Sequence, residues 1–270
     1  MAAARSDGLT LAVLAIIAYA AANMLHEGAG HGGACLLVHG HPLVWSAVHF
    51  DCDLTGLGPA AGRIVAAGGT VANLLAAGAA WWLVIRRTPR SANLQFLLWV
   101  FATINLLQAT GYFLFSGVGG IGDWADVMRG SMSPAVWRPG LAIVGGGLYW
   151  PSTRFAVGRL EPFLDPTQPE RYRNGARICW MVYLSGGALY CVAGLFNPVG
   201  MVLVAISAAA ASFGGTSGLA WGSQFLRAPA PMTSAAPQPL RLRRRHAWTV
   251  GGLLFGAIFV LILGPGIHFR

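Results

Sequence analysis

Two histidines and a glutamate, His26, Glu27 and His31, lie within the first long apolar stretch of the chain. Glu27 is the only acidic residue inside any of the apolar stretches described below. An ionisable side chain at membrane depth is energetically expensive, so it favours a functional role. A buried histidine bonded to a neighbouring carbonyl is the structural alternative. Three such residues so close together favour the functional interpretation.

This set of residue types is typical of a zinc hydrolase, in which two histidines bind the metal and the glutamate activates a water. The usual spacing, H-E-x-x-H, leaves the imidazoles about 40° apart on an α-helix. Here the spacing is H-E-x-x-x-H, and on a regular α-helix His26 and His31 diverge by about 140°. A one-residue π-bulge, eased by Gly28 and Gly30, would bring them together. Otherwise Glu27 and His31 form the metal-binding pair, and the spacing leaves both arrangements open.

The composition indicates that these residues belong to a membrane protein. The 270 residues are 55% hydrophobic and only 10% charged, whereas soluble domains carry roughly a quarter charged residues. The mean hydropathy of +0.58 agrees. Soluble, disordered and fibrous classes are therefore excluded. The basic residues are all arginine, 18 in number, and form no patch interleaved with aromatics, so no nucleic-acid partner is expected.

The fold class predicted is an all-α polytopic membrane protein with about 6-7 transmembrane helices. A span needs roughly 20 apolar residues. The candidates are 9–38, 60–85, 94–117, 140–158, 176–196, 199–221 and 247–266. Pro151 and Arg154 interrupt the fourth, which could be re-entrant. The stretch 18–20 resembles a signal-peptide cleavage site, but the apolar run continues past it, which favours an uncleaved first helix.

The arginines indicate an orientation. With seven spans and a cytoplasmic N-terminus, four arginines lie outside, namely Arg63, Arg129, Arg138 and Arg270, and the other fourteen lie inside. This asymmetry follows the positive-inside rule. We therefore expect a multi-pass protein of a bacterial inner (plasma) membrane. The same orientation puts 26–31 and the end of the third span on one side of the membrane.

In these features the chain resembles the site-2 protease family of intramembrane zinc metallopeptidases, over about residues 9–130. In that family H-E-x-x-H on a first core helix precedes a glycine-containing turn and a β-hairpin-like segment. Here 26–31 precedes Gly40 and a stretch, 43–50, that is rich in β-forming residues. A short β-hairpin or re-entrant segment is therefore possible at 39–58. The stretch 68–73 is similar to the family's Ala-Gly-Pro-x-x-Asn pattern.

The resemblance implies a zinc-dependent peptidase that hydrolyses membrane-embedded substrates. His26, His31 and Asp123 would bind Zn²⁺, with Asp126 as the fallback for the third ligand, and Glu27 would be the general base. Asn73 and Asn105 are weaker candidates for binding the substrate or the oxyanion, with interhelical hydrogen bonding as the alternative.

The resemblance and the composition together divide the chain into four parts. They are a metallopeptidase-like core at 1-130, additional transmembrane helices at 131-226, a Pro/Ala-rich and then Arg-rich cytoplasmic linker at 227-246, and a C-terminal transmembrane helix at 247-270.

Two other functions are open. The stretch 215–218 matches the G-x-S-G pattern of rhomboid serine peptidases, but neither His246 nor His268 is well placed as a partner for Ser217. The second alternative function is that of a catalytically inactive peptidase-like protein or a subunit of a complex.

Two further groups of residues are read as structural. The loop residues His39, His41, His49, Asp51 and Asp53 could line substrate entry or form a second metal site, although a solvated loop is favoured. The scattered cysteines, Cys35, Cys52, Cys179 and Cys191, indicate neither a disulfide framework nor a cysteine zinc site.

Overall fold

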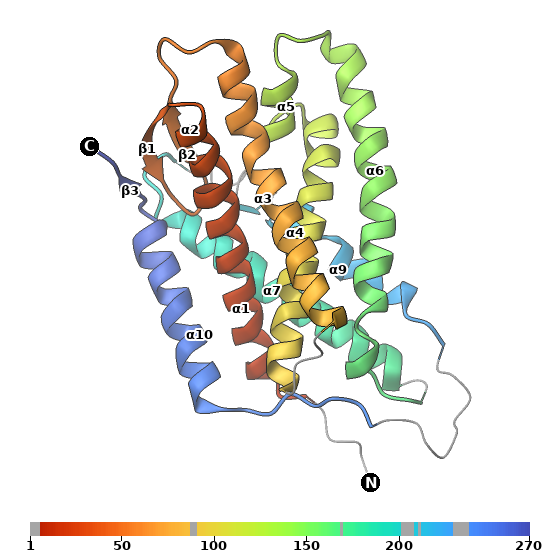
Figure 1. The fold of residues 1–270 in the computed structure, drawn as a ribbon. Coiled ribbons are helices and arrows are strands. Elements are labelled where there is room, and N and C mark those ends of the chain that lie inside the picture. Colours follow the sequence, from red (N-terminus) through yellow and green to blue (C-terminus); the bar gives the residue numbers. More distant parts are fainter. Residues whose placement is uncertain (1–5, 87–90, 168–169, 201–207, 210–211, 229–237) are drawn as a thin grey trace.

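The computed structural model describes residues 6–86, 91–167, 170–200, 208–209, 212–228 and 238–270. Long helices run side by side, and a small sheet lies near one end of the bundle (Figure 1). Within the described residues, five helices are long and apolar enough to cross a membrane. They are Gly8–Leu37, Pro59–Ile85, Ala92–Gly119, Glu170–Leu195 and His246–Leu263. The chain is therefore a multi-pass helical membrane protein.

The predicted count of 6-7 spans is too high for the described residues. The fourth stretch, 140–158, belongs to a helix of 25 residues, α6 (Pro134–Gly158), which packs along α4. Two arginines and two internal prolines keep α6 from being apolar enough to count as a span; they are Arg138, Pro139, Pro151 and Arg154. The sixth stretch, 199–221, includes 201–207 and 210–211, which lie outside the described residues.

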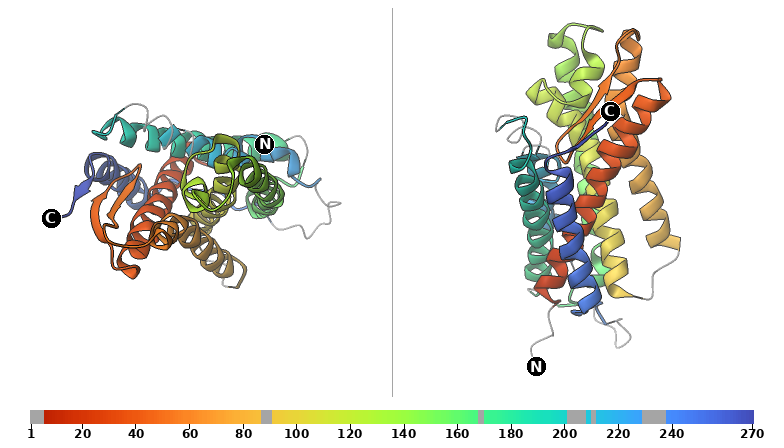
Figure 2. Two further views of the ribbon diagram at one scale, coloured as in Figure 1. Left: turned by 90° about the horizontal axis from the view of Figure 1, so that it is seen from above. Right: turned by 90° about the vertical axis from the view of Figure 1, so that its left-hand side faces the viewer.

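The first helix changes its winding along its length. It begins as α1 (Gly8–Met24), continues as the π-helix η1 (Leu25–Gly32) and ends as α2 (Gly33–Leu37). Asp7 caps its start, where the carboxylate accepts a hydrogen bond of 2.9 Å from the backbone N–H of Thr10. α1 packs against α4, α7 and α10, and Figure 2 shows it enclosed by these helices.

The other helices complete the bundle. They are α3 (Pro59–Arg86), α4 (Ala92–Gly119), α5 (Asp123–Met128), α7 (Glu170–Leu195), α9 (Gly218–Trp221) and α10 (His246–Ile258). Short segments are the 3₁₀-helices η2 (Glu161–Phe163) and η4 (Gly222–Phe225) and the π-helix η5 (Phe259–Leu263). Buried small residues such as Ala15, Ala18 and Ala22 let α1 approach its neighbours closely, as is usual in membranes.

The predicted hairpin is confirmed. β1 (His41–Trp45) and β2 (Phe50–Asp53) pair antiparallel, with His41 opposite Asp53 and Trp45 opposite Phe50. A third strand, β3 (Ile267–His268), pairs with the other edge of β1 and was not predicted. It comes from the far end of the chain, and a two-residue strand leaves no pattern in the sequence.

The expectation that the cysteines form no disulfide was wrong. Cys35 and Cys52 are bonded to each other, with a Cα–Cα distance of 6.0 Å, and the bond joins α2 to β2. The two residues are 17 positions apart, so their meeting depends on the hairpin folding back over the end of the first helix. Cys179 and Cys191 are free.

Most of the described arginines gather at the end of the bundle opposite the sheet. There the Arg171 guanidinium donates to the carbonyl of Arg227 over 2.8 Å, and that of Arg177 donates to the carbonyl of Ser6 over 3.1 Å. Arg244 forms an ion pair of 2.9 Å with Asp7, the cap of α1. Within the predicted linker, 227–246, residues 238–245 have no regular secondary structure and cross this end.

Candidate metal centre

The π-helix η1 brings the two histidines together. Its residues 25–32 include both, and π-helical hydrogen bonds join residues five apart, the spacing of His26 and His31. Their Nε2 atoms lie 3.2 Å apart and their rings are perpendicular, with centroids 4.8 Å apart. Of the two arrangements that the spacing left open, the structure has the π-helical one.

Asp123 lies against both imidazoles. Its Oδ2 is 3.2 Å from Nε2 of His26 and 3.6 Å from Nε2 of His31. Asp123 is the first residue of α5, and the preceding Gly122 has a φ of 85°, which turns the chain back from the end of α4. The indole N–H of Trp124 donates to the Thr70 hydroxyl over 3.0 Å and fixes α5 to α3.

Asp126, the fallback ligand, is engaged elsewhere. Its carboxylate pairs with Arg129 over 2.7 Å.

Burial raises the pKa of Asp123, but the adjacent His31 and His26 more than offset this effect and hold that pKa below its ordinary value. Asp123 is therefore an ionised carboxylate beside two imidazoles.

These three side chains fit a tetrahedral metal ion. Bonds of about 2.1 Å at tetrahedral angles separate neighbouring ligand atoms by about 3.4 Å. The three separations here are 3.2, 3.2 and 3.6 Å. Oδ2 of Asp123 is also buried without a hydrogen bond from any described residue. A cation at the centre of the triangle would satisfy that oxygen and both Nε2 lone pairs.

Glu27 lies next to this triangle. One potential metal-binding atom from each of His26, Glu27 and His31 lies within 4.8 Å of the other two, and the three residues are buried. Glu27 could therefore serve as a ligand in place of Asp123. The shorter contacts of Asp123 favour the aspartate as the ligand and leave Glu27 beside the site.

Hydrogen bonds at the Nδ1 atoms of His26 and His31 orient both imidazoles. Nδ1 of His31 lies 2.8 Å from the carbonyl oxygen of Val65, so it donates its proton there and leaves Nε2 for a metal. The Asn73 amide lies 3.2 Å from Nδ1 of His26, while its Oδ1 is buried without a partner among the described residues. Exchanging the two ends of this amide lets Oδ1 accept the Nδ1 proton and frees Nε2 of His26.

The amide group of Asn105 hydrogen-bonds within its own helix. It donates to the carbonyl of Phe101, one turn earlier on α4, over 2.8 Å.

Glycines let η1 and α3 meet backbone to backbone. A Cβ at Gly30 would lie 2.6 Å from Cα of Gly69, and one at Gly68 would lie 2.4 Å from the carbonyl oxygen of Gly30. A Cβ at Gly69 would lie 2.4 Å from Cε1 of His26 and 2.7 Å from Nε2 of His31. The glycines of the 68–73 stretch therefore form one wall of the candidate site.

Tyr112 is a site residue that the sequence analysis missed. Its ring stacks on His26, with centroids 5.0 Å apart and 25° between the planes. It also lines the same cavity as Glu27, His31 and Asp123. Its one signal in the sequence was a polar aromatic residue in a predicted span, and aromatic residues are common in such spans.

A polar cavity of about 730 Å³ is lined by Glu27 and by two of the three candidate ligands, His31 and Asp123. The hairpin contributes His49 and Asp51 to its wall, and Arg63 and Arg129 lie at its margin. His39, His41 and Asp53 are not among the lining residues. In the part of the chain that the structure describes, the His26 cluster is the one group placed to hold a metal, so the loop forms no second metal site there.

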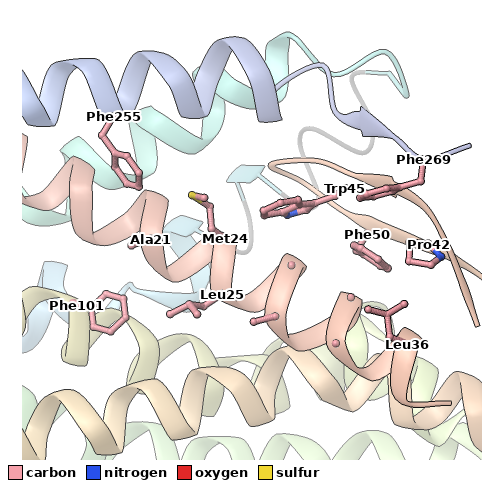
Figure 3. A pocket seen from close by; sticks show the side chains of 14 residues that line it. Ala21, Met24, Leu25, Leu36, Pro42, Trp45, Phe50, Phe101, Phe255 and Phe269 are labelled. Carbon is pink, nitrogen blue, oxygen red and sulfur yellow. The ribbon is translucent and has the colours of Figure 1, made fainter. Parts of the chain in front are cut away.

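A second, apolar cavity of about 620 Å³ lies against the other face of η1 (Figure 3). Its floor consists of residues of the first helix, and aromatic side chains of the hairpin, α4, α10 and the residue that follows β3 surround it. The lining residues are Ala21, Met24, Leu25, Gly28, Ala29, Gly32, Gly33, Leu36, Pro42, Trp45, Phe50, Phe101, Phe255 and Phe269. We call this cavity the apolar groove.

Ser217, the residue of the G-x-S-G pattern, is part of a different network. Its hydroxyl lies 3.2 Å from that of Tyr149, which donates to the carbonyl of Gly215 over 2.9 Å. No histidine of the described residues hydrogen-bonds to Ser217, so the structure supports no serine–histidine pair.

Comparison with protein-family models, with curated proteins and with solved structures gives no significant match for this chain.

Proposed function

We propose that this protein is an intramembrane metallopeptidase that binds zinc through His26, His31 and Asp123. The observation that carries the proposal is the triangle of Nε2, Nε2 and Oδ2 atoms, whose sides match the ligand separations of tetrahedral zinc. The main argument for an inactive protein was the extra residue between the histidines. The π-helix weakens that argument, because it brings the two imidazoles together despite the extra residue. The resemblance to site-2 proteases rests on the same residues and remains part of this proposal.

The residues beside the triangle suit peptide hydrolysis. A bound zinc supplies Lewis acidity, which polarises a peptide carbonyl and lowers the pKa of a water. Glu27 accepts a proton from the attacking water and passes it to the leaving amine nitrogen, so that water and peptide become a carboxylic acid and an amine. The cavity beside Glu27 is large enough to admit a peptide segment, and its polar wall can hydrogen-bond to the peptide backbone.

We infer that the sheet end of the molecule faces outside the cytoplasm. Arginines concentrate at the opposite end, in agreement with the positive-inside rule. The Cys35–Cys52 disulfide lies at the sheet end, and disulfides persist mainly in oxidising compartments. The substrate would be a membrane-protein segment presented at that outer side, in a bacterial inner membrane.

Metal content tests the proposed ligands. The detergent-purified wild type should contain about one zinc per chain, and His31→Ala and Asp123→Ala should lose it. Glu27→Gln should keep the metal, because the triangle does not include Glu27. Loss of zinc in Glu27→Gln with retention in Asp123→Asn would assign the third ligand to Glu27. A wild type that binds no zinc after dialysis against it would refute the metal site.

Peptidase activity is tested with the same variants. Zinc-loaded wild type should cleave a panel of single-span model substrates in vesicles, and Glu27→Gln should lower the rate by at least a hundredfold. Wild type and Glu27→Gln should bind zinc equally, so that a difference in cleavage isolates the base. Stoichiometric zinc without cleavage of any substrate in the panel would instead indicate a non-enzymatic member of a complex.

A further inference from the structure

The apolar groove has a shape and a depth that suit a ligand from the membrane itself. Figure 3 shows it running along the first helix, from Phe101 and Phe255 at one end to Leu36, Pro42 and Phe269 at the other. At the α-helical rise of 1.5 Å per residue, its floor between Ala21 and Leu36 is at most about 22 Å long, since the π-helical part rises less. One leaflet of the hydrocarbon core is about 15 Å thick. The groove therefore covers the depth of one leaflet, parallel to the spans that form it.

The wall of the groove offers no polar partner to an occupant. Its lining residues bring no charged side chain and no hydroxyl or amide. The indole N–H of Trp45 is itself buried within the wall. The backbone of β1 is paired on both edges, with β2 and β3. An extended peptide would leave its N–H and C=O groups unsatisfied here, at several kcal/mol for each.

A transmembrane helix is too wide for the groove. A helix 10 Å in diameter fills about 1,200 Å³ over the depth of one leaflet. The groove holds about 620 Å³, roughly half of that. A flexible hydrocarbon chain needs neither a polar partner nor so much width.

We propose that the apolar groove is a binding site for one acyl chain of a membrane phospholipid. The acyl chain would lie against the glycine-rich face of η1, on the side opposite His26, Glu27 and His31. It would be held between the first helix, α10 and the sheet. This site does not depend on the metal or on peptidase activity.

The floor of the groove provides a substitution that fills it. A Cβ at Gly33 meets no atom within 4 Å, so Gly33→Leu places its side chain in the groove without a backbone clash. Gly78, on the α3 span, also has nothing within 4 Å and is exposed. Gly78→Leu is therefore the matched control, because it adds the same side chain to a membrane-facing surface away from the groove.

Photolabelling tests the site. Wild type and variants are reconstituted in phosphatidylethanolamine/phosphatidylglycerol vesicles with a trace of phospholipid that carries a diazirine on one acyl chain, and labelled peptides are identified by mass spectrometry. We expect labels to concentrate on 21–50 and 255–269, to fall at least fivefold in Gly33→Leu and to stay unchanged in Gly78→Leu. Leu36→Trp, at a residue 62% exposed, is a second groove-filling variant should Gly33→Leu fold poorly.

Two results would overturn the proposal. Labels spread evenly over all apolar helix faces, with no response to either groove-filling variant, would show that no chain is held there. Crosslinks between two protein chains at 21–50, found with a bifunctional reagent, would show that a second copy covers the groove. Because the readout is lipid labelling, either result leaves the proposed zinc site and peptidase activity untouched.

Discussion

Gly69 lies on α3 directly against His26 and His31, and it cannot carry a side chain without displacing them. The methyl group of Gly69→Ala would meet Cε1 of His26 and Nε2 of His31 far inside van der Waals distance. We expect this variant to bind zinc at least tenfold more weakly than wild type, because the imidazoles must move apart. Competition with a chromogenic zinc chelator measures the change.

Gly78→Ala is the control for that prediction. It lies on the same helix and its new methyl group meets no atom within 4 Å. Its zinc affinity should equal that of wild type, and its stability should rise by up to about 1 kcal/mol through helix propensity. Equal zinc affinity in Gly69→Ala and Gly78→Ala would contradict the proposed position of the metal.

Tyr112 supports His26 through its ring, so its hydroxyl should be dispensable for metal binding. Tyr112→Phe keeps the stacked ring and should leave the rate of zinc release within about twofold of wild type. Tyr112→Ala removes a packed ring beside the imidazole and should release zinc at least tenfold faster, as measured by transfer to a chelator. Equal release rates in Tyr112→Ala and wild type would show that the stacking contributes nothing.

The residue types of the site could be read from the sequence, while its contacts could not. A lone acid among apolar residues marks Glu27, and two histidines beside it suggest a metal. The meeting of Asp123 with them depends on the turn at Gly122 and on the Trp124–Thr70 hydrogen bond. Tyr112 and Gly69 contribute through packing between helices, which no local pattern records.

At the scale of the element, η1 determines whether the histidines converge. Deleting Ala29, which is exposed on the groove side, changes the spacing to H-E-x-x-H and leaves Gly30 to pack against Gly68. We expect the shortened segment to become α-helical, with the imidazoles about 40° apart, and to bind zinc within about tenfold of wild type.

The opposite change should abolish the site. An alanine inserted after Ala29 separates the histidines by six residues, a spacing that neither an α-helix nor a π-helix aligns. Zinc titration of both variants, with circular dichroism to check helix content, makes the comparison. Zinc binding by the insertion variant at wild-type affinity would contradict the π-helical geometry.

Elements with a local pattern were predictable, and those made by distant contacts were not. The five spans and the β1–β2 hairpin follow from apolar length and β-forming residues. The helix of α6 was also expected, but its arginines and prolines make it too polar to count as a span. The disulfide and β3 join residues brought together by the fold, since Cys52 reaches α2 through the hairpin and β3 comes from the end of the chain.

The arginine-rich end links the start of α1 to the segment before α10, and this link should depend on pH. Hydrogen bonds from Arg244 and Thr10 lower the pKa of Asp7 from 3.8 to about 2. Because the folded state lowers this pKa, the stabilisation is complete above about pH 4 and disappears as the pH falls toward 2. Asp7→Ala should cost about 1 kcal/mol at pH 7, the usual value of an N-cap.

Thermal unfolding in detergent from pH 7 to pH 2 measures this dependence. The difference in melting temperature between wild type and Asp7→Ala should be constant down to about pH 4 and shrink below it. Asp7→Asn retains a capping side chain without the charge, so it should lie between the two at neutral pH. A difference that stays constant down to pH 2 would show that the charge of Asp7 does not stabilise the fold.

The orientation of the whole molecule decides which compartment supplies substrate to the candidate site. Ser131 lies at the sheet end and Glu170 at the arginine-rich end, and both are exposed. In a Cys179→Ser/Cys191→Ser background that keeps the native disulfide, Ser131→Cys should react with a membrane-impermeant maleimide in intact bacterial cells. Glu170→Cys should react only after permeabilisation. The reverse pattern would place His26 and Asp123 on the cytoplasmic side, where the Cys35–Cys52 bond would be exposed to reduction and the arginines would violate the positive-inside rule.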